Sequence, residues 1–106
     1  MDIAEWRTKI DDLDRRMVEL LNQRAHAAQE IGKLKRNTSM PIYEPDREKK
    51  IFENVRTANK GPLPDNELHH IYERVIDVMR NLQKVEITPA AKGVEDATEF
   101  DVEVND

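Results

Sequence analysis

Apolar residues along the first third of the chain alternate in steps of three and four, which is the spacing of one helix face. The row consists of Ile3, Trp6, Ile10, Leu13, Met17, Leu20, Leu21, Ala27, Ala28, Ile31 and Leu34. No proline or turn cluster interrupts it between Ile3 and Asn37. The pattern predicts one helix about 50 Å long at about 1.5 Å per residue. A compact monomer of this size has a radius of gyration of only about 13 Å, so we expect a helical bundle shared between two chains.

Two shorter helices follow. The segment from Asn37 to Pro41 breaks the first helix, and Pro45 suits the first turn of a second one. The Gly-Pro-Leu-Pro run that begins at Gly61 ends this helix, and Asp65 can cap a third. The apolar positions are Ile51, Phe52 and Val55 on the second helix and Leu68, Ile71, Tyr72, Val75, Ile76, Met79 and Leu82 on the third. We therefore predict an all-α chain of three helices with one very long N-terminal helix.

The composition is polar, with 38% apolar and 37% charged residues and no cysteine. Disulfides, thiolate metal sites and a cysteine nucleophile are thereby excluded. A short chain without disulfides gains core by pairing with another subunit. The first residues carry no secretory pattern, and no apolar run approaches the roughly 20 residues of a membrane span. We expect a soluble, cytoplasmic protein.

The net charge of −5 is unevenly distributed. Residues 86–106 contain seven acidic residues against one lysine, whereas residues 1–85 contain sixteen basic and fifteen acidic residues. We predict a helical domain over residues 1–85 and an acidic, disordered tail over residues 86–106, although Phe100, Val102 and Val104 alternate as in a strand. A body with a net charge of +1 lacks the broad basic face that nucleic-acid binding needs.

Several charged or polar side chains stand in or beside the apolar rows. Arg24 lies within the first row, and Lys35 follows it by eleven residues. The two are therefore about 20° apart around the helix and about 16 Å apart along it, within reach of one small molecule. Arg7 precedes Arg24 by seventeen residues, about 25 Å away and turned by about 100°. If Arg7 belongs to the same site, a partner chain supplies it.

The other two helices add further polar groups. Arg47 and Glu48 lie one turn before the apolar stripe of the second helix, and Gln83 follows Met79 by four residues. Burying unpaired cations costs several kcal/mol each, so we expect an anionic ligand, and a small di-acid with a hydroxyl would suit the set. Each residue alone also has a plain interpretation, such as a solvated cation at the edge of a helix stripe or, for Gly32, close approach of two helices.

Other kinds of site are poorly supported. Glu67 and His70 have the Glu-x-x-His spacing of di-iron bundles, but a second such pair is missing. The three histidines lack metal-ligand spacing, and Ser39, the sole serine, has no histidine near it in sequence. No glycine-rich phosphate loop occurs. We therefore predict neither a metal nor a nucleophilic triad.

Three stretches resemble one known family, the all-helical chorismate mutases. They read WRTKIDDLDRRMVELLNQRAHAAQEIGKLKR, PIYEPDREKKI and GPLPDNELHHIYERVIDVMRNLQ. The resemblance covers residues 3–85 and is strongest to the mutase domains linked to the first enzyme of aromatic biosynthesis, which share the Tyr-x-Pro-x-Arg-Glu and Gly-Pro turns. It implies an intertwined homodimer with two sites, each using residues of both long helices.

The resemblance also implies an activity and roles for residues. The activity is the rearrangement of chorismate to prephenate, which uses no cofactor. The residues that match family site positions in one chain are Arg24, Lys35, Arg47, Glu48 and Gln83, and Arg7 matches the arginine that the partner contributes. Glu44 stands where relatives have Asp or Glu, and Met79 replaces a small hydroxyl residue of some members. Lys35 and Gln83 would donate to the ether oxygen, while Arg24 would grip a carboxylate.

The sequence is also compatible with three other functions. An isochorismate-pyruvate lyase shares the scaffold and a similar cationic site. A non-catalytic helical module that dimerises or regulates another aromatic-pathway enzyme is a second possibility, and a DNA-associated helical dimer is a third. From the residues without the resemblance, the expectation is only a helical dimer that binds a small anion.

Overall fold

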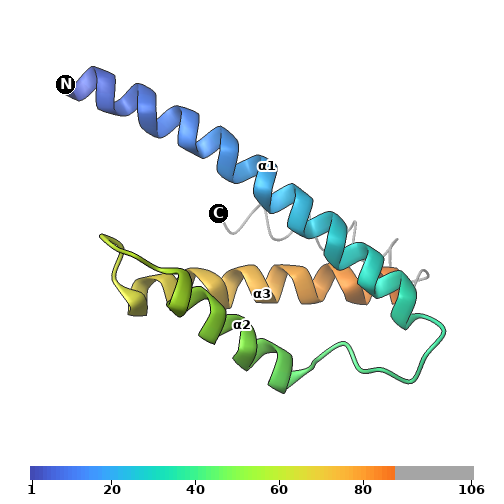
Figure 1. Ribbon diagram of the computed structural model, residues 1–106. Coiled ribbons are helices and arrows are strands. Elements are labelled where there is room, and N and C mark those ends of the chain that lie inside the picture. The colour runs from blue at the N-terminus through green and yellow to red at the C-terminus, as the bar shows by residue number, and fades with distance from the viewer. Residues whose placement is uncertain (88–106) are drawn as a thin grey trace, which may run out of the picture.

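The computed structural model describes residues 1–87 and contains three helices (Figure 1). They are α1 (Ile3–Lys35), α2 (Pro45–Ala58) and α3 (Asp65–Ile87). The predicted all-α class and the very long N-terminal helix are thus confirmed. The predicted boundary after residue 85 is wrong by two residues, because Glu86 and Ile87 continue α3 and Glu86 is buried. The rest of the predicted tail, residues 88–106 with the alternation from Phe100 to Val104, lies outside the described residues.

The helix ends follow local sequence signals. Asp2 caps α1, since its Oδ1 accepts a hydrogen bond of 2.8 Å from the Glu5 backbone N–H. Pro45 is the first residue of α2. Asp65, which the sequence suggested as the cap of α3, is instead its first residue, and its Oδ1 accepts from Asn59 Nδ2 at 2.7 Å. If Asp65 were the N-cap, its side chain would accept a hydrogen bond from the Leu68 backbone N–H. That N–H donates instead to the carbonyl of Pro64.

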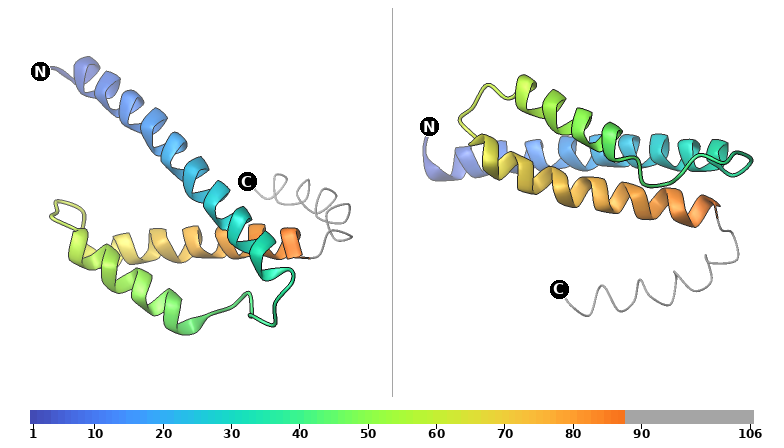
Figure 2. Two further views of the ribbon diagram at one scale, coloured as in Figure 1. Left: turned by 45° about the vertical axis from the view of Figure 1, so that its right-hand side comes forward. Right: turned by 90° about the horizontal axis from the view of Figure 1, so that it is seen from below.

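Helix α3 is the central element, with α1 against one side and α2 against another (Figure 2). Within residues 1–87, α1 and α2 do not contact each other. A Cβ on Gly32 of α1 would lie 2.9 Å from Gln83 Cα and 3.0 Å from Gln83 O on α3. Gly32 therefore permits a close approach of the two helices, as the sequence suggested. Beyond it, Arg36 Nε donates to the Glu86 carbonyl at 2.9 Å and ties the two helix ends together.

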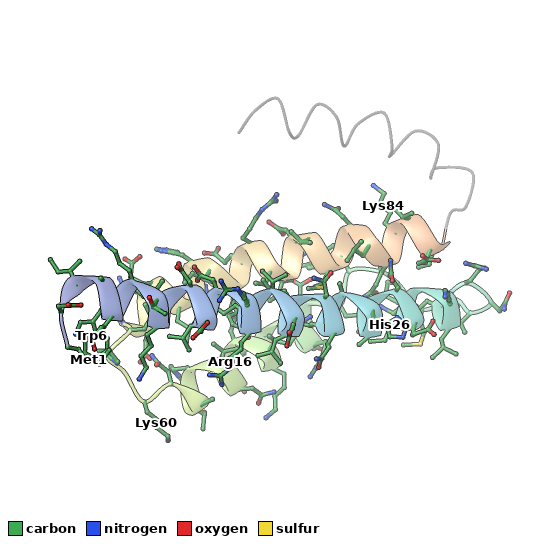
Figure 3. The ribbon with its side chains drawn as sticks, turned by 90° about the horizontal axis from the view of Figure 1, so that it is seen from above. Met1, Trp6, Arg16, His26, Lys60 and Lys84 are labelled. Carbon is green, nitrogen blue, oxygen red and sulfur yellow. The ribbon has the colours of Figure 1, made fainter. Side chains whose placement is uncertain are left out.

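The core of the single chain is small. Ala28, Ile76 and Met79 are the buried apolar residues within the described part. The N-terminal half of α1 extends away from α2 and α3 (Figures 1 and 2), and Trp6 and Arg16 project from it (Figure 3). Trp6, Ile10 and Met17 are each more than half exposed. The Cα radius of gyration, 16.7 Å, exceeds the roughly 13 Å of a compact domain of this length.

The apolar row of the first helix is therefore confirmed as a helix face but is mostly bare in one chain. No helix within residues 1–87 combines the length and the apolar character that crossing a bilayer requires.

Candidate active site

A cavity of about 410 Å³ separates the C-terminal half of α1 from the start of α2, and α3 closes it. It exists because α1 and α2 both pack on α3 without meeting each other. Its lining is Arg24, Ala27, Ala28, Ile31, Lys35, Ile42, Glu44, Arg47, Glu48, Ile51, Ile76, Met79, Arg80 and Gln83. Seven of the eight predicted site residues are in this set, and Arg7 is not.

Lys35 is the most enclosed charge of the cavity, with 6% of its surface exposed. It is the last residue of α1, where the negative end of the helix dipole favours a cation. Its Nζ donates to Gln83 Oε1 at 3.0 Å and lies 3.5 Å from Glu44 Oε1. An ammonium group has three protons, so one remains for a ligand in the cavity.

Gln83 lies on α3, where the close contact at Gly32 fixes its backbone. Because its oxygen accepts from Lys35, the amide N–H groups remain available as donors. Met79, one turn earlier on α3, is buried and lines the same cavity with an apolar surface. Lys35 and Gln83 thus form a paired set of donors at one place in the wall.

Glu48 of α2 is held by Arg80 of α3, a residue that sequence reasoning missed. Arg80 Nη2 lies 2.8 Å from Glu48 Oε1 and 2.7 Å from Oε2, and Arg80 Nε lies 3.1 Å from Oε2. Hydrogen bonding to Glu48 raises the pKa of Arg80 above its ordinary, already strongly basic value, against the effect of burial. The spacing contained the signal, since Arg80 follows the inward Ile76 by four residues and precedes Gln83 by three.

The remaining two cations of the cavity have no such partner. Neither Arg24 nor Arg47 has a carboxylate within ion-pair distance among residues 1–87, whereas Lys35 is paired with Glu44 and Arg80 with Glu48. Arg24 is half-buried, so its guanidinium is partly removed from water. The four cations and two carboxylates leave the cavity with a net charge of +2. A small dianion would balance this charge.

Arg7 is exposed on the free half of α1 and is absent from the wall of the cavity. Within one chain, Arg7 therefore does not reach the cavity that Arg24 lines.

A larger cavity, of about 560 Å³, lies between α2 and α3 on the side of Phe52 and His69, whose rings stack at 4.1 Å. Its charged lining includes two cations, Lys49 and Arg56, against the carboxylates of Glu48, Glu53 and Asp65. This excess of negative charge disfavours an anion. The larger cavity is therefore less suited to a dianionic ligand than the smaller one between α1 and α2.

Comparison with known proteins identifies the scaffold. The family described as chorismate mutase type II matches residues 6–84, which include every cationic group of the smaller cavity. The chain belongs to this family.

Relatives of the family occur both alone and as parts of longer proteins. The chain is 38% identical over 87 residues to a bifunctional chorismate mutase/prephenate dehydratase of Aquifex aeolicus, covering 78% of this chain and 24% of that protein. It is 31% identical over 83 residues to a chorismate mutase of Methanocaldococcus jannaschii, covering 77% of this chain and 84% of the relative. It thus spans about a quarter of the bifunctional relative and most of the archaeal one.

Solved structures agree. A structure titled as chorismate mutase, form II, from Thermus thermophilus superposes with a TM-score of 0.75 at 28% identity. The superposition covers 77% of this chain and 93% of the Thermus chain. The three-helix arrangement of this mutase-family chain is therefore that of a chorismate mutase structure.

Proposed function

We propose that this chain is a chorismate mutase, which rearranges chorismate to prephenate in the cavity between α1 and α2. The observation that carries the proposal is the charge arrangement: Arg24 and Arg47 are unpaired among residues 1–87, while the other two cations of the cavity each have a carboxylate partner. Chorismate carries two carboxylates, and two free guanidinium groups match them. Membership of the family supports the same substrate.

The rearrangement is intramolecular, so its atoms balance within one molecule. One C–O bond of the ether breaks as one C–C bond forms, and no proton, electron or second reactant is exchanged. Catalysis then consists of holding the reactive, folded conformer and stabilising negative charge that grows on the ether oxygen.

Lys35 and Gln83 are the groups that stabilise this oxygen. The Lys35 ammonium has a proton beyond those directed to Gln83 and Glu44, and the Gln83 amide presents its N–H groups because its oxygen is occupied. Two fixed donors in a largely enclosed wall cost little reorganisation during the reaction. Deletion of one such donor typically costs about 3–4 kcal/mol.

The other predicted residues bind and orient the substrate. Arg24 and Arg47 neutralise the carboxylates, for which a planar guanidinium allows a bidentate grip. Glu48, with Glu44 nearby on the same wall, accepts from the ring hydroxyl. Met79 supplies an apolar surface where some members of the family have a small hydroxyl residue.

We further propose that the working unit is an intertwined homodimer in which Arg7 of the partner completes each site. Support comes from the bare row on α1, where Trp6, Ile10 and Met17 are more than half exposed. Burying each large apolar side chain contributes about 1.5–3 kcal/mol, so covering this row with a second chain is strongly favourable. A second α1 would bring Arg7 as part of the same contact.

Similarity to mutase domains linked to the first enzyme of aromatic biosynthesis leads us to propose another aromatic-pathway enzyme as a partner. The Gly-Pro turn of those domains recurs here at Gly61 and Pro62. Co-purification with that enzyme, followed by comparison of mutase turnover with and without it, tests the association. Unchanged turnover and separate elution would count against it.

One assay tests the activity. Purified chain is given chorismate and, separately, isochorismate, and chorismate loss, prephenate formation and pyruvate release are recorded. We expect prephenate to form in step with chorismate loss, without pyruvate. Pyruvate from isochorismate would favour the lyase alternative, and absence of turnover on either substrate would favour a non-catalytic module.

A further inference from the structure

Arg80 contributes a fourth positive charge to the cavity but is not free to bind a ligand. Its guanidinium has Nε and Nη2 directed at Glu48, and Nη1 lies 3.3 Å from Asp77 Oδ1. Its Cζ also lies 5.2 Å from the centre of the Tyr43 ring, a cation–π distance. Three protein groups therefore hold this guanidinium in place.

The ion pair has an asymmetric geometry. Glu48 Oε2 accepts from two nitrogens of Arg80, whereas Oε1 accepts only from Nη2, at 2.8 Å. Each carboxylate oxygen has two lone pairs, so Oε1 retains one for a ligand. The fork of Arg80 thus fixes the plane of the carboxylate and leaves a defined oxygen able to accept.

The Arg80–Glu48 ion pair also links α3 to α2, which packs loosely on it. Helix α2 has no buried residue, and within the described residues its helix partner is α3 alone. Glu48 lies in the first turn of α2, at the cavity. The bidentate bond to Arg80 therefore sets both the orientation of the carboxylate and the position of the end of α2 that faces α1.

We infer that Arg80 is a positioning residue that acts on the reaction through Glu48. It holds one oxygen of the Glu48 carboxylate toward the substrate hydroxyl, and its positive charge offsets the negative charge of that carboxylate, which would otherwise repel a dianion. The inference rests on the proposed mutase function. Without Arg80, three cations of the cavity would face two carboxylates, so its net charge would fall from +2 to +1 and it would attract chorismate less strongly.

A double-mutant cycle tests this role. The full chain is prepared as wild type, Arg80→Gln, Glu48→Gln and the double variant, and kcat and KM for chorismate are measured for each. We expect Arg80→Gln to lower kcat/KM roughly ten- to a hundredfold in the wild-type background. Because Arg80 orients Glu48, the same substitution should change kcat by less than about twofold in the Glu48→Gln background, whereas the loss of a positive charge raises KM in both backgrounds. Equal losses of kcat in both backgrounds would overturn the inference.

Arg80→Lys separates charge from orientation. A lysine retains the positive charge but lacks the bidentate fork, so we expect KM near that of the wild type with kcat still reduced. Wild-type kcat in this variant would overturn the orienting role. Since the lysine variant keeps a cation beside Glu48, it also provides a folded reagent if Arg80→Gln does not fold.

Arg74→Gln is the matched control. Arg74 is exposed on the same helix and lies outside the cavity wall, so its variant should retain wild-type kcat/KM. An active wild type in which Arg80→Gln and Arg74→Gln behave alike would overturn this inference alone. An inactive wild type would overturn the proposed function, and this inference with it.

Discussion

The polar side chains of the cavity are of two kinds: some have a hydrogen-bond or ion-pair partner within the protein, and others do not. Lys35 and Arg80 have carboxylate partners, and Gln83 shares a hydrogen bond with Lys35. Arg24 and Arg47 do not have such partners in the described part of the chain. The paired side chains are held in place before a ligand binds. The two unpaired arginines are the groups with which the carboxylates of a dianion would form ion pairs.

Replacement of Lys35 by alanine tests the preorganised donor. We expect Lys35→Ala to lower kcat by roughly a hundred- to a thousandfold with a much smaller change in KM, because the donor acts mainly on charge formed in the transition state. Lys33→Ala is the control, since Lys33 is half-exposed and pairs with Glu30 on the outer face of α1. Near-normal turnover in Lys35→Ala would contradict the assigned role.

The pH dependence of turnover tests whether a titrating group takes part. Gln83 is neutral at every ordinary pH, and the raised pKa of Arg80 keeps that guanidinium charged. A raised pKa means that the stabilising contribution of Arg80 is complete below the unfolded value and is lost only at strongly alkaline pH. We therefore expect kcat and the stability from this pair to vary little between about pH 6 and 8. A steep loss of kcat across that window would indicate a missed acid or base.

At the scale of elements, the contact between α1 and α3 determines where the donors meet. The sequence was sufficient for the three helices, because apolar spacing and Pro and Gly breaks report local structure directly. It also placed Arg24, Lys35 and Gln83 on inward faces. It did not reveal the Arg80–Glu48 pair, because a contact between helices depends on their relative rotation and on which of several polar neighbours meet.

Gly32→Ala tests this helix contact. The added methyl would meet backbone atoms of Gln83 at 2.9 and 3.0 Å, and backbone cannot rotate away. Overpacking typically costs about 1–3 kcal/mol, which exceeds the gain of about 0.8–1 kcal/mol in helix propensity. We expect a lower melting temperature and a lower kcat, as α3 shifts Gln83 away from Lys35. Thermal unfolding and turnover, with Thr8→Ala as control, provide the measurement; higher stability with normal kcat would contradict the account.

For the molecule as a whole, the decisive feature is the N-terminal half of α1, against which no other helix of the described chain packs. Periodicity predicted that this face would be apolar and that its length required a second chain, and the same residues stand exposed in the single chain. Which residues of a partner cover them is not contained in a one-dimensional pattern, because antiparallel and parallel pairing place the same row against different neighbours.

A charge placed on this row should break the proposed dimer. We expect Ile10→Lys to shift the mass in solution from dimer to monomer and to abolish turnover, because a lysine in an apolar interface is costly to bury. Thr8→Lys introduces the same charge on the opposite face of α1 and should leave both mass and turnover unchanged. Mass by light scattering is the measurement, and a monomeric wild type with full activity would contradict the dimer.

The central claim is that each site is assembled from both chains. Complementation between two inactive variants is its most direct test. Arg7→Ala and Lys35→Ala are each expected to be nearly inactive as homodimers. In a heterodimer, one site would combine the intact Lys35 of one chain with the intact Arg7 of the other. Co-refolding equal amounts should then restore about a quarter of wild-type turnover, since half the dimers are mixed and one site in each is intact. Turnover no higher than the sum of the two separate variants would contradict the account.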